Sequence, residues 1–363
     1  MTLAVDATWM ARALQLAERG LNTTSPNPRV GCVMVKDGKN IGEGWHERAG
    51  EPHAEVHALL VAGRTTKGAT AYVTLEPCSH HGRTPPCADA LIAAGVKRVV
   101  VAMQDPNPLV AGRGNAKLKA AGVAVECGLM EAAARELNIG FISRMTRGTP
   151  WVRSKIAASL DGRTALANGL SKWITGEAAR QDVQQWRARS CAVLTGSGTV
   201  LADDPQLNVR TGDVVRQPLR VVLDTELRIS SDAKILQGGN MLIYTASTDA
   251  AKQVALRERG VDVGVMQQVE GGLPLSAVLS DLARRGINEV LVEAGKTLNG
   301  ALLKAGLVDE LVLYLAPQLL GDAARGLANL DELTQLEQRV ELAWQDVRHV
   351  GNDIRITARV KHV

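Results

Sequence analysis

The chain has 363 residues, 45% of them hydrophobic, and its 42 Lys and Arg residues against 38 Asp and Glu give a net charge of +4. This length exceeds the size at which a single hydrophobic core usually stops growing, so we expect two domains. The charges are interspersed and only 3% of the residues are aromatic, which argues against a nucleic-acid or membrane partner.

The sequence predicts neither export nor membrane insertion. No apolar run approaches the roughly 20 residues that cross a bilayer, and the first residues lack a basic segment followed by an apolar one. Five cysteines, an odd number, fit a reducing compartment and metal ligation better than disulfides. We therefore expect a cytoplasmic protein. Cys32, Cys127 and Cys191 lie in apolar strand-like runs, and we interpret them as small core residues.

The first part of the chain predicts helices alternating with strands. Asp6 is predicted to cap a helix over residues 7–19, and Pro52 to open a helix over residues 53–62. Residues 30–36 and 40–45 indicate two strands joined by a hairpin turn. Further strands and helices are predicted over residues 69–75, 85–95, 97–103, 115–122, 123–128 and 131–138. This order predicts an α/β layered sheet in which strand ends and helix N-termini face the site.

One stretch in this part carries residues suited to a zinc centre. His53, Cys78 and Cys87 offer an imidazole and two thiolates, which suit tetrahedral Zn²⁺ with a fourth position open for water. Glu55 adds a carboxylate two residues after the imidazole. This set matches the zinc deaminase signature, except that the second cysteine lies nine positions after the first rather than three.

The alternative interpretation of this stretch is a structural zinc site. Such a site would need a fourth ligand, for which His57, His80 and His81 are candidates. It would leave Glu55 without a purpose beside the metal. We therefore favour a hydrolytic centre.

The second part of the chain begins after a Gly- and Pro-bearing segment at residues 145–150, which predicts a linker. We expect domains over residues 1–146 and 147–363. Strands are predicted over residues 151–165, 191–200, 219–229, 241–246, 261–266, 288–295 and 307–317, and helices over residues 178–190, 250–259, 274–285 and 297–306. A closing antiparallel hairpin is predicted over residues 340–361, at the edge of a mostly parallel mixed sheet.

The glycine-rich pieces do not complete a nucleotide-binding motif. Residues 196–201 and the Gly42-Glu43-Gly44 segment both fail the dinucleotide pattern, and Gly295-Lys296-Thr297 lacks the first P-loop glycine because position 290 is valine. The strand–Gly–helix order around Gly295 is compatible with a phosphate held by backbone N–H groups, and equally with ordinary turn chemistry.

Periodicity alone assigns no site in the second part. By pattern, Trp173 is a core residue and residues 203–205 form a turn. Arg187, Arg189 and Arg210 are solvated surface charges on the same grounds.

Six motifs spread over nearly the whole chain are similar to one known family. They are HAEVHAL, TLEPCSHHGRTPPC, QDPNPLVAGRG, SLDGRTA, SKWIT and TVLADDPQLNVR. Together they resemble the RibD family of bifunctional riboflavin biosynthesis proteins. The resemblance implies an α/β fold with a cytidine-deaminase-like three-layer domain followed by a dihydrofolate-reductase-like domain.

Two successive reactions follow from this resemblance. In the first, 2,5-diamino-6-(5-phosphoribosylamino)pyrimidin-4(3H)-one loses its 2-amino group as ammonia in a zinc-dependent step. In the second, NADPH reduces 5-amino-6-(5-phosphoribosylamino)uracil to the ribitylamino product.

The resemblance also implies roles for individual residues. His53, Cys78 and Cys87 would bind one zinc ion per chain, and Glu55 would move protons from the bound water to the ring and leaving amine. The pyrimidine-pocket residues would be Asn27, His46 and His80, with Arg83 near the ribose phosphate. Those implied to bind NADPH are Ala157, Trp173, Thr199, Asp203, Thr225, Gly295, Lys296, Thr297, Leu298, Asn299, Gly300 and Ala301. Those implied to contact the reductase substrate are Ser171, Arg187, Leu207, Arg210 and Glu293.

Two other functions are compatible with the zinc motif. A nucleic-acid base deaminase is disfavoured by the balanced charge and by the second domain. A zinc-stabilised nucleotide-binding module without turnover is the other. We expect a phosphoribosylated pyrimidine as the small-molecule partner, no nucleic acid or membrane partner, and a homo-oligomer.

Overall fold

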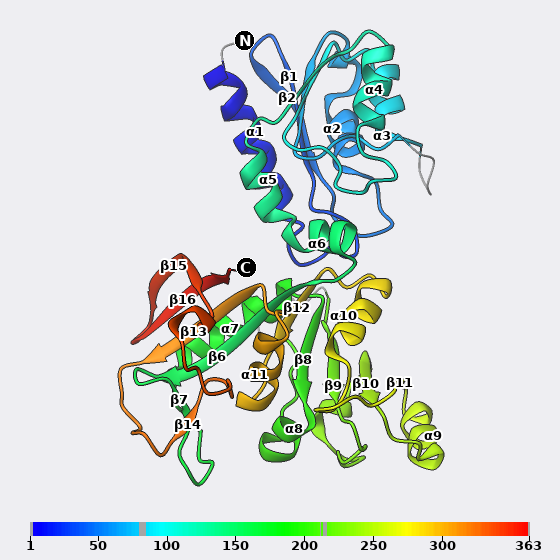
Figure 1. The fold of residues 1–363 in the computed structure, drawn as a ribbon. Helices are drawn as coiled ribbons and strands as arrows, with labels where there is room; N and C mark the ends of the chain where they lie inside the picture. The colour runs from blue at the N-terminus through cyan, green and yellow to red at the C-terminus, as the bar shows by residue number, and fades with distance from the viewer. Residues whose placement is uncertain (1–2, 80–84, 211, 213–215, 362–363) are drawn as a thin grey trace. The chain divides into compact units, whose positions relative to one another are not determined.

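The structure, a computed structural model, describes residues 3–79, 85–210, 212 and 216–361. The chain divides into two compact units, Met1–Thr149 and Pro150–Val363, shown in Figure 1. Each unit has its own sheet and its own hydrophobic core. Among the described helices, none has the length and apolar character that a membrane crossing requires. None of the five cysteines forms a disulfide.

The first unit is built on a five-stranded sheet in the order β2-β1-β3-β4-β5. Its strands are β1 (Gly31–Lys36), β2 (Lys39–Trp45), β3 (Thr70–Val73), β4 (Arg98–Val101) and β5 (Ala124–Cys127). Its helices are α1 (Leu3–Glu18), α2 (Ala54–Ala62), α3 (Cys87–Ala93), α4 (Arg113–Ala120), α5 (Glu131–Leu137) and α6 (Ile139–Arg147), with a 3-10 turn at Gly63–Thr66. Helices α1 and α5 lie on one side of the sheet, and α2, α3 and α4 lie on the other (Figure 1). This is the predicted three-layer arrangement.

The second unit is built on a nine-stranded sheet in the order β11-β10-β9-β8-β12-β6-β13-β16-β15. Its strands are β6 (Trp151–Ser159), β8 (Ala192–Gly196), β9 (Leu219–Leu223), β10 (Met241–Thr245), β11 (Val261–Val265), β12 (Glu289–Val292), β13 (Glu310–Ala316), β15 (Leu342–Val350) and β16 (Asp353–Val360). The strands from β11 to β13 pair in parallel, and β16 and β15 continue antiparallel. The predicted mixed sheet with an antiparallel edge is therefore confirmed.

Helices cover this second sheet, and two short strands extend from it. The helices are α7 (Glu177–Arg189), α8 (Ser197–Asp203), α9 (Ala250–Glu258), α10 (Leu275–Arg284) and α11 (Lys296–Lys304), with 3-10 turns at Lys234–Leu236 and Leu336–Gln338. Strands β7 (Arg163–Ala165) and β14 (Arg325–Gly326) form a separate pair. Both faces of the main sheet are buried: Leu194 of β8 packs into one core cluster and its neighbour Val193 into another, because successive strand side chains point to opposite faces.

Two glycines of β2 bring α2 close to the first sheet. A Cβ added at Gly42 would lie 2.3 Å from the Ala58 carbonyl oxygen, and one added at Gly44 would lie 2.4 Å from the Ala54 carbonyl oxygen. Helix and strand could not approach so closely with any larger residue. The Gly42-Glu43-Gly44 segment is therefore a packing surface for the helix that carries the zinc motif.

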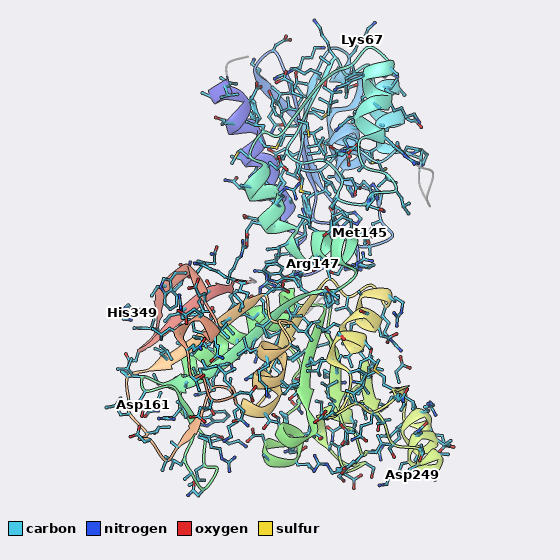
Figure 2. All side chains as sticks on the ribbon, viewed as in Figure 1. Lys67, Met145, Arg147, Asp161, Asp249 and His349 are labelled. Carbon is cyan, nitrogen blue, oxygen red and sulfur yellow. The ribbon has the colours of Figure 1, made fainter. Side chains whose placement is uncertain are left out.

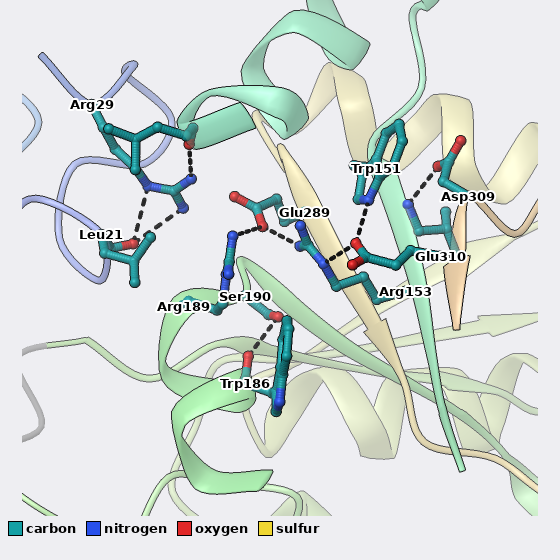
Figure 3. Close-up of polar contacts among 12 residues, drawn as sticks. Leu21, Arg29, Trp151, Arg153, Trp186, Arg189, Ser190, Glu289, Asp309 and Glu310 are labelled. Carbon is teal, nitrogen blue, oxygen red and sulfur yellow. Dashed lines mark hydrogen bonds and ion pairs between the residues drawn. The ribbon is translucent and has the colours of Figure 1, made fainter. Parts of the chain in front are cut away.

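A buried charge cluster fixes strand register at the amino-terminal ends of the second sheet (Figure 3). Arg153 of β6, 2% exposed, donates to Glu310 of β13 (2.7 Å) and to Glu289 of β12. Glu310 also accepts from the Trp151 indole (3.1 Å), and Glu289 from Arg189 (3.3 Å). The prediction that Arg189 is a surface charge is therefore wrong. Because both carboxylates meet one guanidinium, a register slip would leave a buried charge without its partner.

Four local predictions about the first unit differ from the structure. Helix α1 begins at Leu3, so Asp6 lies inside its first turn rather than capping it. Helix α2 begins at Ala54 with His53 as an extended cap residue, so Pro52 lies just outside the helix. Cys127 is exposed because β5 is an edge strand, although a core position was predicted.

The fourth difference is α6, which occupies the start of the predicted linker. Its last residue, Arg147, labelled in Figure 2, donates from Nε and Nη2 to the Ser143 hydroxyl (3.1 and 2.6 Å). Gly148, with φ of 70°, then ends the helix.

In the second unit the predicted strand over residues 191–200 is only half a strand. It stops at Gly196, and Ser197–Asp203 form α8. The prediction failed because Val200, which made the run look continuous, packs into the core from a helix.

Candidate active sites

The first candidate site lies where α2 and α3 begin. The His53 Nδ1, Cys78 Sγ and Cys87 Sγ atoms all lie within 4.8 Å of one another. His53 Nδ1 is 3.3 Å from the Cys87 sulfur and 3.7 Å from the Cys78 sulfur. Zinc bond lengths of about 2.1–2.3 Å in a tetrahedron separate ligand atoms by about 3.6 Å, so one nitrogen and two sulfurs fit a zinc ion here.

Two helix N-termini place these ligands. His53 is the cap residue of α2, and Cys87 is the first residue of α3. The Cys87 thiol lowers the pKa of Cys78 against the effect of burial. His53 and the Cys87 backbone N–H, which donates to the Cys78 sulfur (3.2 Å), lower this pKa further. Partial positive charge at helix starts favours thiolate, the form that binds metal.

Glu55 lies in the first turn of α2 beside the three ligands. Its side chain is buried, with 3% exposed. Burial raises its pKa to about 7, and the nearby Cys78 sulfur adds to the rise while His53 opposes it. A carboxyl group that gains and loses a proton near neutrality is suited to proton transfer.

Asn27 and His46 lie next to this cluster, as the resemblance implied. The His46 and His53 rings meet edge-on with centroids 5.3 Å apart. His46 Nδ1 lies 3.1 Å from the Pro52 carbonyl oxygen, which can only accept, so Nδ1 carries the proton and Nε2 accepts from the Asn27 amide (3.0 Å). Burial lowers the pKa of His46, which favours the neutral ring. The other two predicted pocket residues, His80 and Arg83, lie outside the described residues.

Glu76, two residues before Cys78, is a positioning residue that the sequence reasoning missed. Its buried carboxylate accepts backbone N–H groups from Asp105 (3.1 Å), Gly112 (2.9 Å) and Asn115 (3.0 Å). It thereby ties the QDPNPLVAGRG segment to the strand end that leads to the cysteine. The signal was present in the LEPC motif, where an acidic residue directly follows an apolar strand.

The second candidate site is a cavity of about 1840 Å³ in the second unit. It is lined from the strand ends after β8, β9 and β12 and from the starts of α8 and α11, the edge where α/β sheets place ligands. Predicted residues on its wall are Ala157, Ser171, Trp173, Arg187, Thr199, Asp203, Leu207, Arg210, Thr225, Glu293, Gly295, Lys296, Thr297, Leu298 and Ala301.

Two residues of the predicted cofactor loop turn inward instead. Asn299 is 1% exposed; its amide donates to the Ala294 carbonyl (3.0 Å) and accepts from the Ser154 hydroxyl (3.0 Å). A Cβ at Gly300 would lie 2.2 Å from the Asn329 carbonyl oxygen. Both sit on the face of α11 that packs inward, where these contacts hold the helix in place.

The remaining cavity wall fits a dinucleotide. Gly198 and Gly295 both line the cavity, and a Cβ added at either would meet no atom within 4 Å. These positions leave room for a ligand to reach the backbone. Helix α11 also begins there, with Gly295 as its cap, so backbone N–H groups are available for a phosphate.

Trp173 and Arg187 show why periodicity alone failed here. Trp173 is 69% exposed at the cavity, with Arg180 stacked 4.7 Å from its ring, so the prediction of a core residue is wrong. Arg187 is 8% exposed and so is not a solvated charge. It makes a two-pronged ion pair with Glu293 (2.5 and 3.0 Å) and donates to the Asn208 carbonyl (3.1 Å).

Lys155 joins this ion pair and was also missed. Its Nζ lies 3.9 Å from the Glu293 carboxylate on the cavity wall. Burial lowers the pKa of Lys155, with Glu293 opposing, and Arg187 holds the pKa of Glu293 below its usual value against the effect of burial. The only signal in the sequence was a lysine inside a predicted strand.

Two glutamines anchor the loop that carries Leu207 and Arg210. Gln184 of α7 accepts the Arg210 backbone N–H (3.0 Å). The Gln217 side chain both accepts from the Val209 N–H and donates to the Val209 carbonyl (2.9 Å each), as a neighbouring strand would. With its backbone held, Arg210 projects an exposed guanidinium at the cavity.

Comparisons with known proteins assign a domain family to each unit. Residues 3–103 match the cytidine and deoxycytidylate deaminase zinc-binding region, and residues 150–356 match the RibD C-terminal domain. The riboflavin biosynthesis protein RibD of Escherichia coli (strain K12) is 52% identical, over 96% of this chain and 98% of that protein. The Haemophilus influenzae RibD is 46% identical, over 99% of this chain and 98% of that protein.

Solved structures give the same result. Acinetobacter baumannii RibD superposes with a TM-score of 0.93 at 50% identity, covering 99% of this chain and all of that one. A Thermotoga maritima diaminohydroxyphosphoribosylaminopyrimidine deaminase/5-amino-6-(5-phosphoribosylamino)uracil reductase superposes with a TM-score of 0.88 at 33% identity, covering 99% of both chains.

Proposed function

The chain belongs to the RibD family of riboflavin biosynthesis proteins, and from this premise we propose how its residues divide the work between two sites. It is a bifunctional enzyme, with a zinc-dependent deaminase domain followed by an NADPH-dependent reductase domain. The first site deaminates the diaminohydroxyphosphoribosylaminopyrimidine. The second reduces the resulting 5-amino-6-(5-phosphoribosylamino)uracil.

At the deaminase site, His53, Cys78 and Cys87 hold zinc, which when bound activates a water molecule for attack on an amino-bearing ring carbon. Glu55 would take one proton from the attacking water and pass it to the ring nitrogen as the C–O bond forms. It would then carry the second proton of that water to the amino group, which leaves as ammonia when the C–N bond breaks. The Asn27 and His46 pair, fixed by the Pro52 carbonyl, orients the pyrimidine. The observation that carries this proposal is the convergence of three ligand atoms within 4.8 Å beside one buried carboxyl group.

At the reductase site, NADPH supplies a hydride, and the cavity wall aligns it with the ribosyl carbon. Arg210, exposed on its anchored loop, binds the substrate phosphate. Arg187 is engaged by Glu293, so its main task is to hold that carboxylate beside the ribosyl group. Lys155 completes this charged wall.

Replacing the Glu55 carboxylate tests the proposal. Glu55→Gln keeps the size and the zinc ligands but removes the proton acceptor, so we expect ammonia release to fall at least about 100-fold with zinc content unchanged. NADPH oxidation should persist when the deaminated uracil compound is supplied. Exposed Glu51→Gln, four residues away, is the matched control and should retain full ammonia release. Undiminished ammonia release by Glu55→Gln would refute the assignment.

A cytoplasmic location and a homo-oligomeric state remain predictions. The absence of disulfides among the five cysteines supports a reducing compartment. Size-exclusion chromatography with light scattering tests the homo-oligomeric state.

A further inference from the structure

One wall of the reductase cavity is formed by the end of β9 and the start of α8. Strands β8 and β9 are parallel neighbours, and α8 connects them (Figure 1). Ser197, Thr225 and Arg228 all line the cavity here. In Rossmann-type strand–helix–strand units, whose glycine pattern residues 196–201 do not complete, the end of the second strand lies beside the adenosine ribose, and we use that arrangement as an analogy.

The group found at that strand end distinguishes the two nicotinamide cofactors. An acidic side chain accepts the ribose 2′-hydroxyl of NADH, whereas an arginine accommodates the 2′-phosphate of NADPH. This chain has both kinds of residue in the turn after β9: Asp224, Glu226 and Arg228.

The structure removes the first acid from consideration. Asp224 is fully buried, and its Oδ2 accepts the Ile229 backbone N–H (2.9 Å), so it closes the turn instead of facing the cavity. Glu226 points into solvent, with 73% of its side chain exposed, and lies 3.8 Å from the Arg228 guanidinium. An ion pair so exposed contributes little and does not withhold Arg228 from a ligand.

Arg228, by contrast, is held over the cavity wall. Its Nη2 donates to the Ser197 hydroxyl (3.2 Å), which bridges the turn after β9 to the start of α8. Its side chain is 56% exposed. The neighbouring cation Lys234 is paired with Asp204 (3.1 Å). Arg228 is thus an oriented guanidinium next to the Ser197 hydroxyl, with Thr225 on the same cavity wall, a donor set that suits a phosphate.

We propose that Arg228, with Ser197 and Thr225, binds the 2′-phosphate of the adenosine ribose and so makes the reductase prefer NADPH over NADH. This inference rests on the proposed reductase site. It adds the residue that binds the 2′-phosphate, the group by which NADPH differs from NADH.

Binding of two nucleotide fragments tests the inference without any turnover. The probes are adenosine 2′,5′-bisphosphate and adenosine 5′-monophosphate, titrated calorimetrically into the full-length protein. The unmodified protein should bind the bisphosphate more tightly. Arg228→Ala should weaken bisphosphate binding by about 10- to 100-fold and leave monophosphate binding within twofold, because only the former loses a charge-assisted contact. Arg228→Lys, which keeps the positive charge, should lose less bisphosphate affinity than Arg228→Ala.

The controls separate the possible failures. Arg284→Ala, on α10 with 70% of its side chain exposed, removes the same charge elsewhere in the unit and should change neither affinity. The inference would be overturned if Arg228→Ala weakened the binding of both probes equally, or if it weakened the binding of neither probe. Either result would leave the proposed reductase site intact. Failure of the unmodified protein to bind either probe or NADPH would instead overturn the proposed reductase site, and the inference with it.

Discussion

Asp6 stabilises the first unit through contacts that its sequence position does not reveal. Both of its oxygens accept from Arg98 (2.9 Å each), and the Tyr72 hydroxyl donates to it (2.5 Å). The pair is largely buried, with 5% of the Asp6 and 19% of the Arg98 side chain exposed. Without the Asp6 charge, Arg98 would keep, among the described residues, only the more exposed Glu126 carboxylate (2.8 Å) as its partner.

We therefore expect Asp6→Asn to lower the free energy of unfolding by about 2 kcal/mol at pH 7, measured by urea denaturation, because charge-assisted hydrogen bonds of Asp6 are lost. Arg98 holds the pKa of Asp6 below its ordinary value of 3.8, so this stabilisation is present above pH 3.8 and is lost as the pH falls through the lowered value. The difference in the free energy of unfolding between Asp6→Asn and the parent protein should therefore become smaller as the pH falls. Asp89→Asn, which breaks the half-exposed pair with Lys117, is the control and should cost less than about 1 kcal/mol. An equal loss in both variants would contradict the argument.

The residues that the sequence could predict are those whose chemistry is local. The spacing of His53, Glu55 and the cysteines suffices to predict a zinc centre because residue type and order define it. Glu76 and Lys155 were not predicted because their partners come from distant segments of the chain. Glu76 binds the backbone after β4, and Lys155 lies beside the residue after β12. Burial of their charges appears only once the sheets are assembled.

At the level of elements, the position of α2 depends on the absence of a side chain at Gly44. A Cβ there would lie 2.4 Å from the Ala54 carbonyl oxygen and 2.6 Å from the Ala58 nitrogen, in the first turns of the helix. This is the part of α2 that carries His53 and Glu55. A displaced first turn would therefore move a zinc ligand and the proton carrier together.

We expect Gly44→Ala to weaken zinc binding at least about 10-fold, as measured by competition with a chromophoric chelator, because ligand geometry is set by its supporting residues. The reductase activity of the same sample, which depends on the other unit, reports that the chain is otherwise folded. Val61→Ala on the exposed side of α2 should leave zinc affinity unchanged. Native zinc affinity in Gly44→Ala would show that the close approach does not position the ligands.

The elements that were predicted correctly are those with a clear period or a clear stop. Strands β4 and β10 are apolar runs between turn residues, and α11 follows a glycine. Helices α6 and α8 were missed because each directly adjoins another element, so no loop residues separate them in sequence. Their identity is decided by packing, as Val200 shows.

At the scale of the whole molecule, the two reactions are assigned to two units that share no site residue. All deaminase residues named above lie in Met1–Thr149, and all reductase residues lie in Pro150–Val363. The two-domain α/β organisation was predictable because length, the linker glycine and two separate motif sets point the same way. The specific fold of the second unit came from its resemblance to a family, since periodicity alone indicated only a mixed sheet.

This separation predicts that two singly defective chains can complement each other in solution. Glu55→Gln should release ammonia at least about 100-fold more slowly yet oxidise NADPH when given the deaminated compound. Arg187→Ala should release ammonia but oxidise NADPH poorly, because the Glu293 carboxylate loses its partner. A mixture of the two, given the diamino substrate, should oxidise NADPH after a lag, since the intermediate must first accumulate in solution. If the mixture stays inactive although Glu55→Gln accepts added intermediate, the first unit does not release its product, and the sites are coupled within one assembly.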